Sequence, residues 1–478
     1  MGCKLTFTAI LICSFASAED KLERLNIVAL DSQGQPAMGL QSADFQLWKD
    51  GKPQTIAFSR FTGARPLQTA RPLPNEHSNR SAGLPPTVVL IDLLNDRLMS
   101  AAVINNDITR ALRNFESSEG LYLYILTARG DLYPIHALPR ADAALPPAEE
   151  PWTRNIAPML QAALKEVFGF RPVDERDLVV RYDLTARALR TLGSQMRMIP
   201  GRKNLVWVTH GVPLYGTSIS QQTGVDLTNP VRLLASQLER EQIVVYPVAQ
   251  STRGAAAEMN TESNQFLDEF VSLAGGRLYR SGGAEEAIQH AIIDSRSNYQ
   301  VAYYSAPQDS DGKRHKLRVT SPRKDVRLHA KDGIYPVLPP TRPDDLARAS
   351  LEIAAHSPFD ATDIGLRASV TPDPDSKRGV RLDIRIDPSD LFLSQSQNQR
   401  SGKIAILFGV YSETGFEKFS PAIPSDVSLT SEQYELAARD GLAFRQTLTL
   451  GEPVRRVRIV VVDRELGTLG SVTVPVPR

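Results

Sequence analysis

The residues best suited to nucleophilic or metal chemistry are few in this chain. Its two cysteines, Cys3 and Cys13, lie within the first 20 residues. The histidines are His77, His136, His210, His290, His315, His329 and His356. No two of them are four residues apart, the spacing that places two metal ligands on one face of a helix. A Gly-x-Ser-x-Gly segment, which exposes a serine nucleophile at a sharp turn, is also absent from the sequence. We therefore expect no enzymatic activity.

Phosphate and polyanion binding are not indicated either. The segment Gly201-Arg202-Lys203 precedes an apolar run, whereas a phosphate loop must open a helix. The formal net charge is +1, without the basic excess that attracts nucleic acid or an anionic membrane. Carboxylates are plentiful, so their number does not exclude a glycosidase-like pair, but no spacing singles one out. The composition predicts a chain that binds no nucleic acid.

The first 18 residues are typical of a secretory signal peptide. Lys4 precedes an apolar stretch, and Ala16-Ser17-Ala18 offers small residues for cleavage before Glu19. The apolar stretch is shorter than the roughly 20 residues that span a bilayer. A lipoprotein signal is disfavoured, because the bulky Ile12 precedes Cys13. We expect an exported chain, periplasmic or extracellular, with no cysteine after cleavage and no transmembrane anchor.

The elements on either side of residue 87 differ in pattern. Residues 19–63 alternate between apolar and polar side chains with turn residues between them, which predicts β-strands. Residues 64–86 are rich in Pro, Arg, Asn and Ser and are typical of a linker. Residues 87–297 instead show short apolar runs separated by helical spacing, as in a mostly parallel sheet covered by helices on both faces.

The last third of the chain returns to strands. Residues 298–336 contain a few strands, residues 337–345 form a Pro-rich hinge, and residues 346–478 show the regular alternation of a β-sandwich. Neither 19–63 nor 298–336 holds enough strands for a stable sheet. We therefore predict that these two segments pair into one sandwich, with residues 87–297 inserted between them.

Four segments carry a family resemblance. They are residues 31–54, residues 89–95, residues 200–208, and residues 273–277 taken together with Tyr299, Tyr303 and Tyr304. In their order and spacing they resemble the VWFA-related proteins of acidobacterial type, which are exported bacterial proteins. The resemblance covers roughly residues 24–336 and implies a von Willebrand A-like fold: a doubly wound, mostly parallel α/β sheet, here flanked by β-sandwich domains.

That resemblance implies a metal-ion-dependent adhesion site at the carboxyl edge of the sheet. The family's loop after the first strand reads Asp-x-Ser-x-Ser and holds a divalent cation such as Mg²⁺ or Ca²⁺. Here Asp92 matches the leading Asp, Leu94 replaces the first Ser, and Asp96 replaces the second. Leu94 supplies no ligand oxygen, so the implied site is degenerate.

The remaining members of the implied site come from other loops. Asp183 or Thr185 lies where the family's Thr loop is expected. His210 stands where an Asp often precedes Gly, and with Asn95 it would contact the bound ligand. Two alternatives stay open: Asp92 caps the following helix or bonds neighbouring backbone amides, or a softer metal binds through His210 and the carboxylates.

Two functions from different classes follow. The chain is a non-enzymatic binding or adhesion protein that presents this edge to a protein partner, or it is a purely architectural protein of the cell envelope without a ligand there. Loss of the metal ligands favours the second, and the retained Asp92 and Asp96 favour the first.

Overall fold

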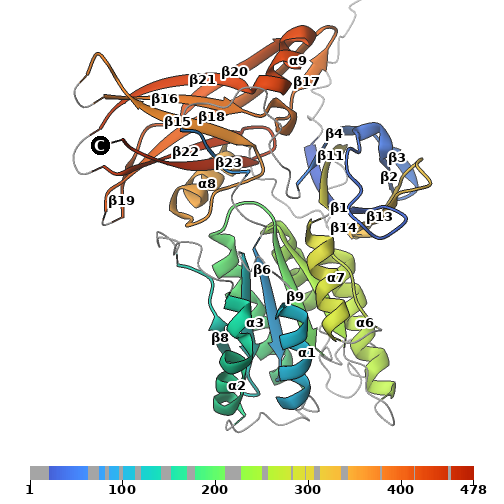
Figure 1. Cartoon of the computed structure of the whole chain (residues 1–478). Coiled ribbons are helices and arrows are strands. Elements are labelled where there is room, and N and C mark those ends of the chain that lie inside the picture. The colour runs from blue at the N-terminus through green and yellow to red at the C-terminus, as the bar shows by residue number, and fades with distance from the viewer. Residues whose placement is uncertain are drawn as a thin grey trace, which may run out of the picture.

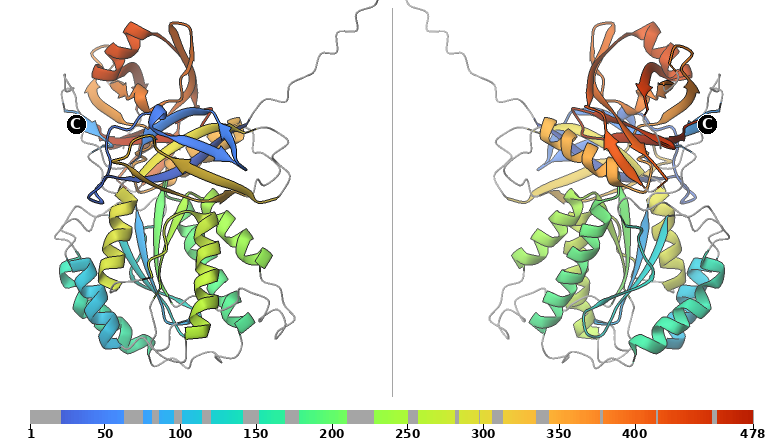
Figure 2. Two further views of the ribbon diagram at one scale, coloured as in Figure 1. Left: turned by 90° about the vertical axis from the view of Figure 1, so that its right-hand side faces the viewer. Right: turned by 90° about the vertical axis from the view of Figure 1, so that its left-hand side faces the viewer.

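The computed structural model of the chain describes residues 21–62, 75–80, 86–95, 101–113, 120–140, 152–168, 178–209, 228–249, 257–280, 284–296, 298–305, 313–334, 343–376, 379–413, 415–450 and 454–477. These residues form three units: a small β-sandwich, a mixed sheet covered by helices, and a larger β-sandwich. The mixed sheet lies at one end of the molecule and the two sandwiches lie together at the other (Figure 1, Figure 2).

The small sandwich combines strands that precede and follow the mixed sheet in the sequence. Its strands and 3-10 helix are β1 (Lys21–Leu30), η1 (Ser42–Asp44), β2 (Gln46–Lys49), β3 (Lys52–Gln54), β4 (Ile56–Phe61), β11 (Asn298–Ser305), β12 (His315–Thr320), β13 (Arg327–Ala330) and β14 (Gly333–Ile334). Its two sheets have the orders β13-β1-β11-β4 and β14-β12-β2-β3. β1 pairs antiparallel with β11, and β2 pairs antiparallel with β12. The strands before and after the inserted segment therefore pair, and their apolar faces share one core.

The mixed sheet has the order β10-β9-β6-β7-β8. Its strands are β6 (Thr87–Asp92), β7 (Leu121–Leu126), β8 (Leu132–His136), β9 (Lys203–Thr209) and β10 (Ile243–Ala249). The first four strands of this order are parallel neighbours, while β8 runs antiparallel to β7. β6, β7 and β9 are buried along their whole length, because their apolar runs face helices on both sides.

Helices cover both faces of this sheet. They are α1 (Ala101–Arg113), η2 (Trp152–Asn155), α2 (Ile156–Val167), α3 (Leu178–Arg197), α5 (Thr228–Arg240), α6 (Ala257–Ala274) and α7 (Ala284–Arg296). Side chains of α1, α2 and α7 pack in the core on one face, and those of α3, α5 and α6 in the core on the other.

The large sandwich takes up most of the C-terminal third. Its elements are α8 (Pro343–His356), β15 (Leu366–Pro372), β16 (Gly379–Ile386), η4 (Pro388–Asp390), β17 (Ser394–Ser396), β18 (Gln399–Tyr411), β19 (Phe416–Phe419), β20 (Ile423–Thr430), α9 (Ser431–Asp440), β21 (Leu442–Thr449), β22 (Arg456–Asp463) and β23 (Leu469–Pro475). One sheet has the order β21-β16-β15-β5, in which β5 is His77–Ser78, and the other is built around β17-β18-β22-β23. α8 begins at Pro343, inside the segment predicted as a hinge, where proline suits the first turn of a helix.

The predicted fold class is wrong. The expected class was α/β plus β, with a doubly wound, mostly parallel sheet flanked by β-sandwich domains, but the structure is mostly β, with 44% of residues in strands and 29% in helices. Among the described residues, four of the five sheets contain only antiparallel pairings, and parallel pairing is limited to three strand pairs of the mixed sheet. The alternation of strands and helices occurs only in the middle of the chain. The segments before and after it consist mainly of antiparallel strands, and the predicted class underestimated their share.

A short segment predicted as linker belongs to the large sandwich. β5 (His77–Ser78) adds to the edge of β15, and Asn79 follows it with no exposed surface. The Asn79 side chain donates to the backbone oxygens of Ala361 and Ile364, at 2.6 and 2.8 Å, and accepts from the Leu366 amide at 2.8 Å. One asparagine thus satisfies three backbone groups of the large sandwich.

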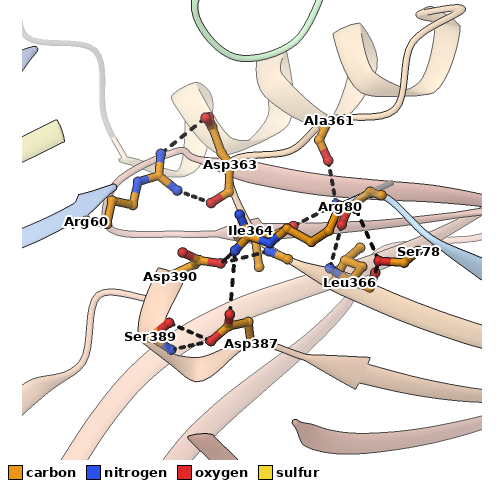
Figure 3. Close-up of polar contacts among 12 residues, drawn as sticks. Arg60, Ser78, Arg80, Ala361, Asp363, Ile364, Leu366, Asp387, Ser389 and Asp390 are labelled. Carbon is orange, nitrogen blue, oxygen red and sulfur yellow. Dashed lines mark hydrogen bonds and ion pairs between the residues drawn. The ribbon is translucent and has the colours of Figure 1, made fainter. Parts of the chain in front are cut away.

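Arg80 anchors the same segment by charge (Figure 3). Its guanidinium forms an ion pair with the fully buried Asp390 and lies 3.5 Å from Asp387. Asp390 also accepts the backbone N–H of Gly365 at 2.9 Å. Residues 75–80, which lie in the sequence between the small sandwich and the mixed sheet, are therefore fixed to the large sandwich.

Buried charges also join the three units to one another. Arg60 of β4 forms a 3.3 Å ion pair with Asp363 of the large sandwich (Figure 3). Arg60 also donates to the Gln300 side chain of β11. Lys331 of the small sandwich donates to Glu239 of α5 at 2.7 Å. These contacts lie at the end of the mixed sheet where β9 begins.

Candidate functional site

The carboxyl edge of the mixed sheet holds the candidate site. Asp92 ends β6, Thr209 ends β9, and the two strands are parallel neighbours in register, with Ile91 opposite Val208. Parallel strands bring their carboxyl ends to the same edge, so these side chains meet there. The edge faces away from both sandwiches (Figure 1).

Asp92 is fully buried and accepts four hydrogen bonds. Its Oδ1 accepts the backbone N–H of Asn95 at 3.0 Å. Its Oδ2 accepts from Asn95 Nδ2 at 2.8 Å, Trp207 Nε1 at 3.1 Å and Thr209 Oγ1 at 2.8 Å. An ionised carboxylate offers about four acceptor positions. These four donors fill them.

Asn95 continues the network to α3. Its Nδ2 also donates to Thr185 Oγ1 at 2.9 Å, and its Oδ1 accepts from the Arg181 guanidinium at 3.0 Å. The Thr185 hydroxyl donates in turn to the backbone oxygen of Arg181 at 2.8 Å. Each hydrogen bond fixes the donor direction of the next, so the Asn95 amide has a single orientation.

The electrostatics of the site are those of a buried anion beside a buried cation. Burial raises the pKa of Asp92 above its ordinary value, and its hydrogen bonds act in the opposite direction. Arg181 is only 7% exposed and lies in the first turn of α3. A positive charge is unfavourable at that end of a helix. The Asn95 side chain lies between the two groups and hydrogen-bonds to both.

These residues do not fit a divalent cation. Mg²⁺ requires a near-octahedral shell of oxygens, and Ca²⁺ requires six or more. The acceptor positions of Asp92 are occupied by N–H and O–H donors, Leu94 is apolar and buried, and the guanidinium of Arg181 already supplies positive charge. No cluster of three or more His, Asp or Glu side chains suited to a metal occurs in the described part of the chain. The backbone bond from Asn95 matches the alternative in which Asp92 binds neighbouring amides.

The structure brings together three of the predicted site residues. Asp92, Asn95 and Thr185 lie in one hydrogen-bonded network. Asp183 is exposed on another face of α3, where it lines a shallow surface pocket with Arg187. Two residues before Thr185, a helical side chain cannot face the same neighbour, which explains the separation.

Two predicted residues, Asp96 and His210, lie outside the described residues. Sequence reasoning missed Arg181, Trp207 and Thr209. The sequence does hold a signal for Arg181: it precedes Thr185 by one turn on the apolar face of α3, where a lone charge needs a partner. Trp207 and Thr209 are two residues apart in β9, so their side chains point to the same face of the sheet. Their bonds to Asp92, however, depend on how β9 is aligned with β6.

Comparison with protein-family models gives no match, and comparison with curated proteins gives none either. Within the described residues, the helices lack the combination of length and apolar character needed to cross a membrane.

Proposed function

We propose that this chain is an exported, non-enzymatic binding protein that contacts a protein partner through the carboxyl edge of the mixed sheet without a metal ion. The observation that carries the proposal is the position and rigidity of that edge. It lies at the end of the molecule remote from both sandwiches (Figure 1), and buried hydrogen bonds fix its side chains in advance. A preformed surface binds with less loss of conformational entropy.

Exposed charges lie on two elements at the same edge. The turn between β7 and β8 carries Arg129 and Asp131, an exposed ion pair at 3.2 Å. Asp183 is exposed at the start of α3. Polar, accessible side chains around a rigid centre suit recognition of a protein surface. Asp92 itself is a poor general base, because it is buried and its acceptor positions are filled.

The first experiment tests whether binding at this edge needs a metal. Thermal unfolding of the chain from residue 19 is followed with EDTA and then with millimolar Mg²⁺, Ca²⁺, Mn²⁺ or Zn²⁺. We expect no change in midpoint. A cation that occupied a native site at 100 times its dissociation constant would add about 2.7 kcal/mol. A rise that disappears in Asp92→Ala would contradict the metal-free proposal.

A second experiment tests the edge directly. The fluorescently labelled chain is titrated against the cell-envelope fraction of its source organism in EDTA. We expect saturable binding that is lost in Arg129→Glu/Asp131→Arg. The control is Arg323→Glu/Asp325→Arg, which reverses an equally exposed pair, 2.7 Å apart, on the small sandwich. Equal binding by the two variants would exclude this edge as the binding surface.

An architectural role is the second candidate. The ion pairs Arg60–Asp363 and Lys331–Glu239 favour it, because they join the small sandwich to the large sandwich and to the mixed-sheet unit, and a rigid spacer requires such a fixed arrangement. Absence of any saturable binding in the titration would favour this role.

A further inference from the structure

We propose that two copies of this chain associate through strand β21 and join their large sandwiches into one continuous sheet. β21 (Leu442–Thr449) is an edge strand: among the described strands it pairs with β16 alone. Half of the backbone N–H and C=O groups of such a strand point away from the sheet, where a second strand can hydrogen-bond to them. This surface is remote from the carboxyl edge of the mixed sheet (Figure 1), and its pairing does not depend on what binds there.

The first support is that the other edge strands of the described sheets are protected against such pairing. Natural sheets protect their edges with short strands, proline, bulges or a covering segment. The edge strands of two to four residues are β3, β5, β13, β14, β17 and β19. Pro134, Pro247 and Pro424 lie in β8, β10 and β20, and the pairing of β4 with β11 is irregular. The free side of β23 is covered by residues 361–364, whose backbone hydrogen-bonds to that strand.

β21 has none of these protections. It has eight residues without a proline, and it pairs in regular register with β16 over its whole length. Its single charged side chain, Arg445, already forms a 2.6 Å ion pair with Asp383 of β16. The edge therefore presents a long, regular row of backbone groups with little net charge, which is the form most open to another strand.

The residue pattern of β21 indicates that its partner is a second copy. Phe444, Gln446 and Leu448 lie on the less exposed face of the strand. Antiparallel strands related by a two-fold axis place residues of the same face opposite one another. Of the two registers with the longest overlap, one puts Arg445 opposite itself, and like charges there are destabilising. The other puts Gln446 on the axis, Phe444 opposite Leu448, and Arg445 opposite Thr447. We assign the second register.

This register also covers apolar surface at the rim of the sandwich. Phe444 and Leu448 are only partly buried, and they pack at the margin of the core of the large sandwich. Each Phe444 would contact Leu448 of the second copy, which removes apolar surface of both from water. A two-fold pair occupies both edges fully, so the assembly closes at two copies.

The test is the association of the chain from residue 19, measured by sedimentation equilibrium. We expect a reversible dimer at high-micromolar concentration that dissociates on dilution. Thr447→Glu should strengthen association and Thr447→Lys should weaken it, each by roughly two- to thirty-fold, because the new charge faces Arg445 of the other copy at two symmetric places. Gln446→Glu and Gln446→Lys should both weaken it, since a residue on the two-fold axis faces itself.

The matched controls are Ser428→Glu and Ser428→Lys, which place the same charges at an exposed position of β20, an edge strand of the other sheet. They should leave the association constant unchanged. Arg381 lies opposite Thr447 within one copy, so unfolding of the dilute monomer separates this intrachain effect from association. A chain that stays monomeric, assemblies that grow beyond two copies, or equal effects of Thr447→Glu and Thr447→Lys would each overturn the proposal.

Discussion

The side chains around Asp92 show how one buried carboxylate can organise three elements. Its donors come from the loop after β6 and from two positions of β9, and Asn95 extends the contact to α3. Hydrogen bonds to a charged group are about twice as strong as neutral ones. The cost of burying Asp92 is offset only while all of these donors remain in place, so each should be individually detectable.

Thr209→Val tests one of these donors with little change in side-chain volume. The variant should lose about 1.5–3 kcal/mol of unfolding free energy, because it removes a hydrogen bond to a buried carboxylate. Thr191→Val is the matched control: its exposed hydroxyl bonds only to the backbone of its own helix, and its loss should stay within about 0.5 kcal/mol. Urea unfolding measures both, and equal losses would show that the Thr209 bond contributes nothing specific.

At the scale of elements, β5 and its flanking residues hold the chain to the large sandwich through side chains more than through strand pairing. β5 has only two residues, whereas Asn79 and Arg80 make buried contacts with several segments of that sandwich. An edge strand this short is marginal by itself. We conclude that the asparagine and the arginine determine where this segment lies.

Arg80→Ala should therefore destabilise the chain by about 3–5 kcal/mol, because it removes the guanidinium that faces the fully buried Asp390. Arg445→Ala removes an arginine from an exposed ion pair with Asp383 on the same sheet and should cost at most about 1 kcal/mol. The two unfolding free energies are compared in guanidinium chloride. Similar losses would mean that Arg80 is not an anchor.

The sequence predicts the positions of individual strands and helices better than it predicts the proportions of strand and helix in the fold or the contacts between elements. The apolar runs at 87–91, 204–209 and 243–248 correspond to β6, β9 and β10, because a buried strand needs an unbroken apolar run. The pairing of the segments before and after the mixed sheet was predicted because neither segment holds enough strands for a stable sheet of its own. The fold class was wrong, because the β-then-α pattern was given too much weight.

Side-chain partners across the fold were not predictable from local pattern. Residues 75–80 are mostly polar, and their contacts are made to residues close to 300 positions away. Within the candidate site, Asp92 and Thr185 were identified as neighbours by analogy, while the guanidinium between the elements was missed. Helical spacing places Arg181 on the buried face, but only the assembled network shows what it contacts.

At the scale of the whole molecule, a buried charged junction joins the three units. Lys203 begins β9 and is 4% exposed, and its ammonium donates to the Ile199 backbone oxygen at 3.1 Å. Burial lowers its pKa to about 8 from the ordinary 10.5, although Asp363 and Glu241 act in the opposite direction. Lys203 is therefore held less favourably as a cation in the folded chain than in the unfolded one.

This shift predicts a pH-dependent contribution to stability. Between about pH 8 and 10.5 the unfolded chain keeps the Lys203 proton while the folded chain releases it, so stability rises with pH across this window, and the full cost of the buried ammonium is present below about pH 8. Lys203→Met should be more stable than wild type at pH 7, and its advantage should shrink by about 3 kcal/mol by pH 10.5. The exposed Lys52→Met serves as control. Parallel stability curves for wild type and Lys203→Met would refute the prediction.

The pairing of distant segments has a consequence for the time at which the chain can fold during synthesis. β1 pairs with β11, and Asn79 bonds to Ala361, 282 residues further along. At about 5–20 residues per second, the ribosome needs roughly a quarter of a minute to a minute to deliver those partners. Throughout that interval the apolar face of β1 and the polar groups of the Asn79 side chain lack their native contacts, because the residues that make those contacts have not yet been synthesised. A nascent chain of this kind should depend on chaperones that hold its N-terminal strands apart until translation is nearly finished.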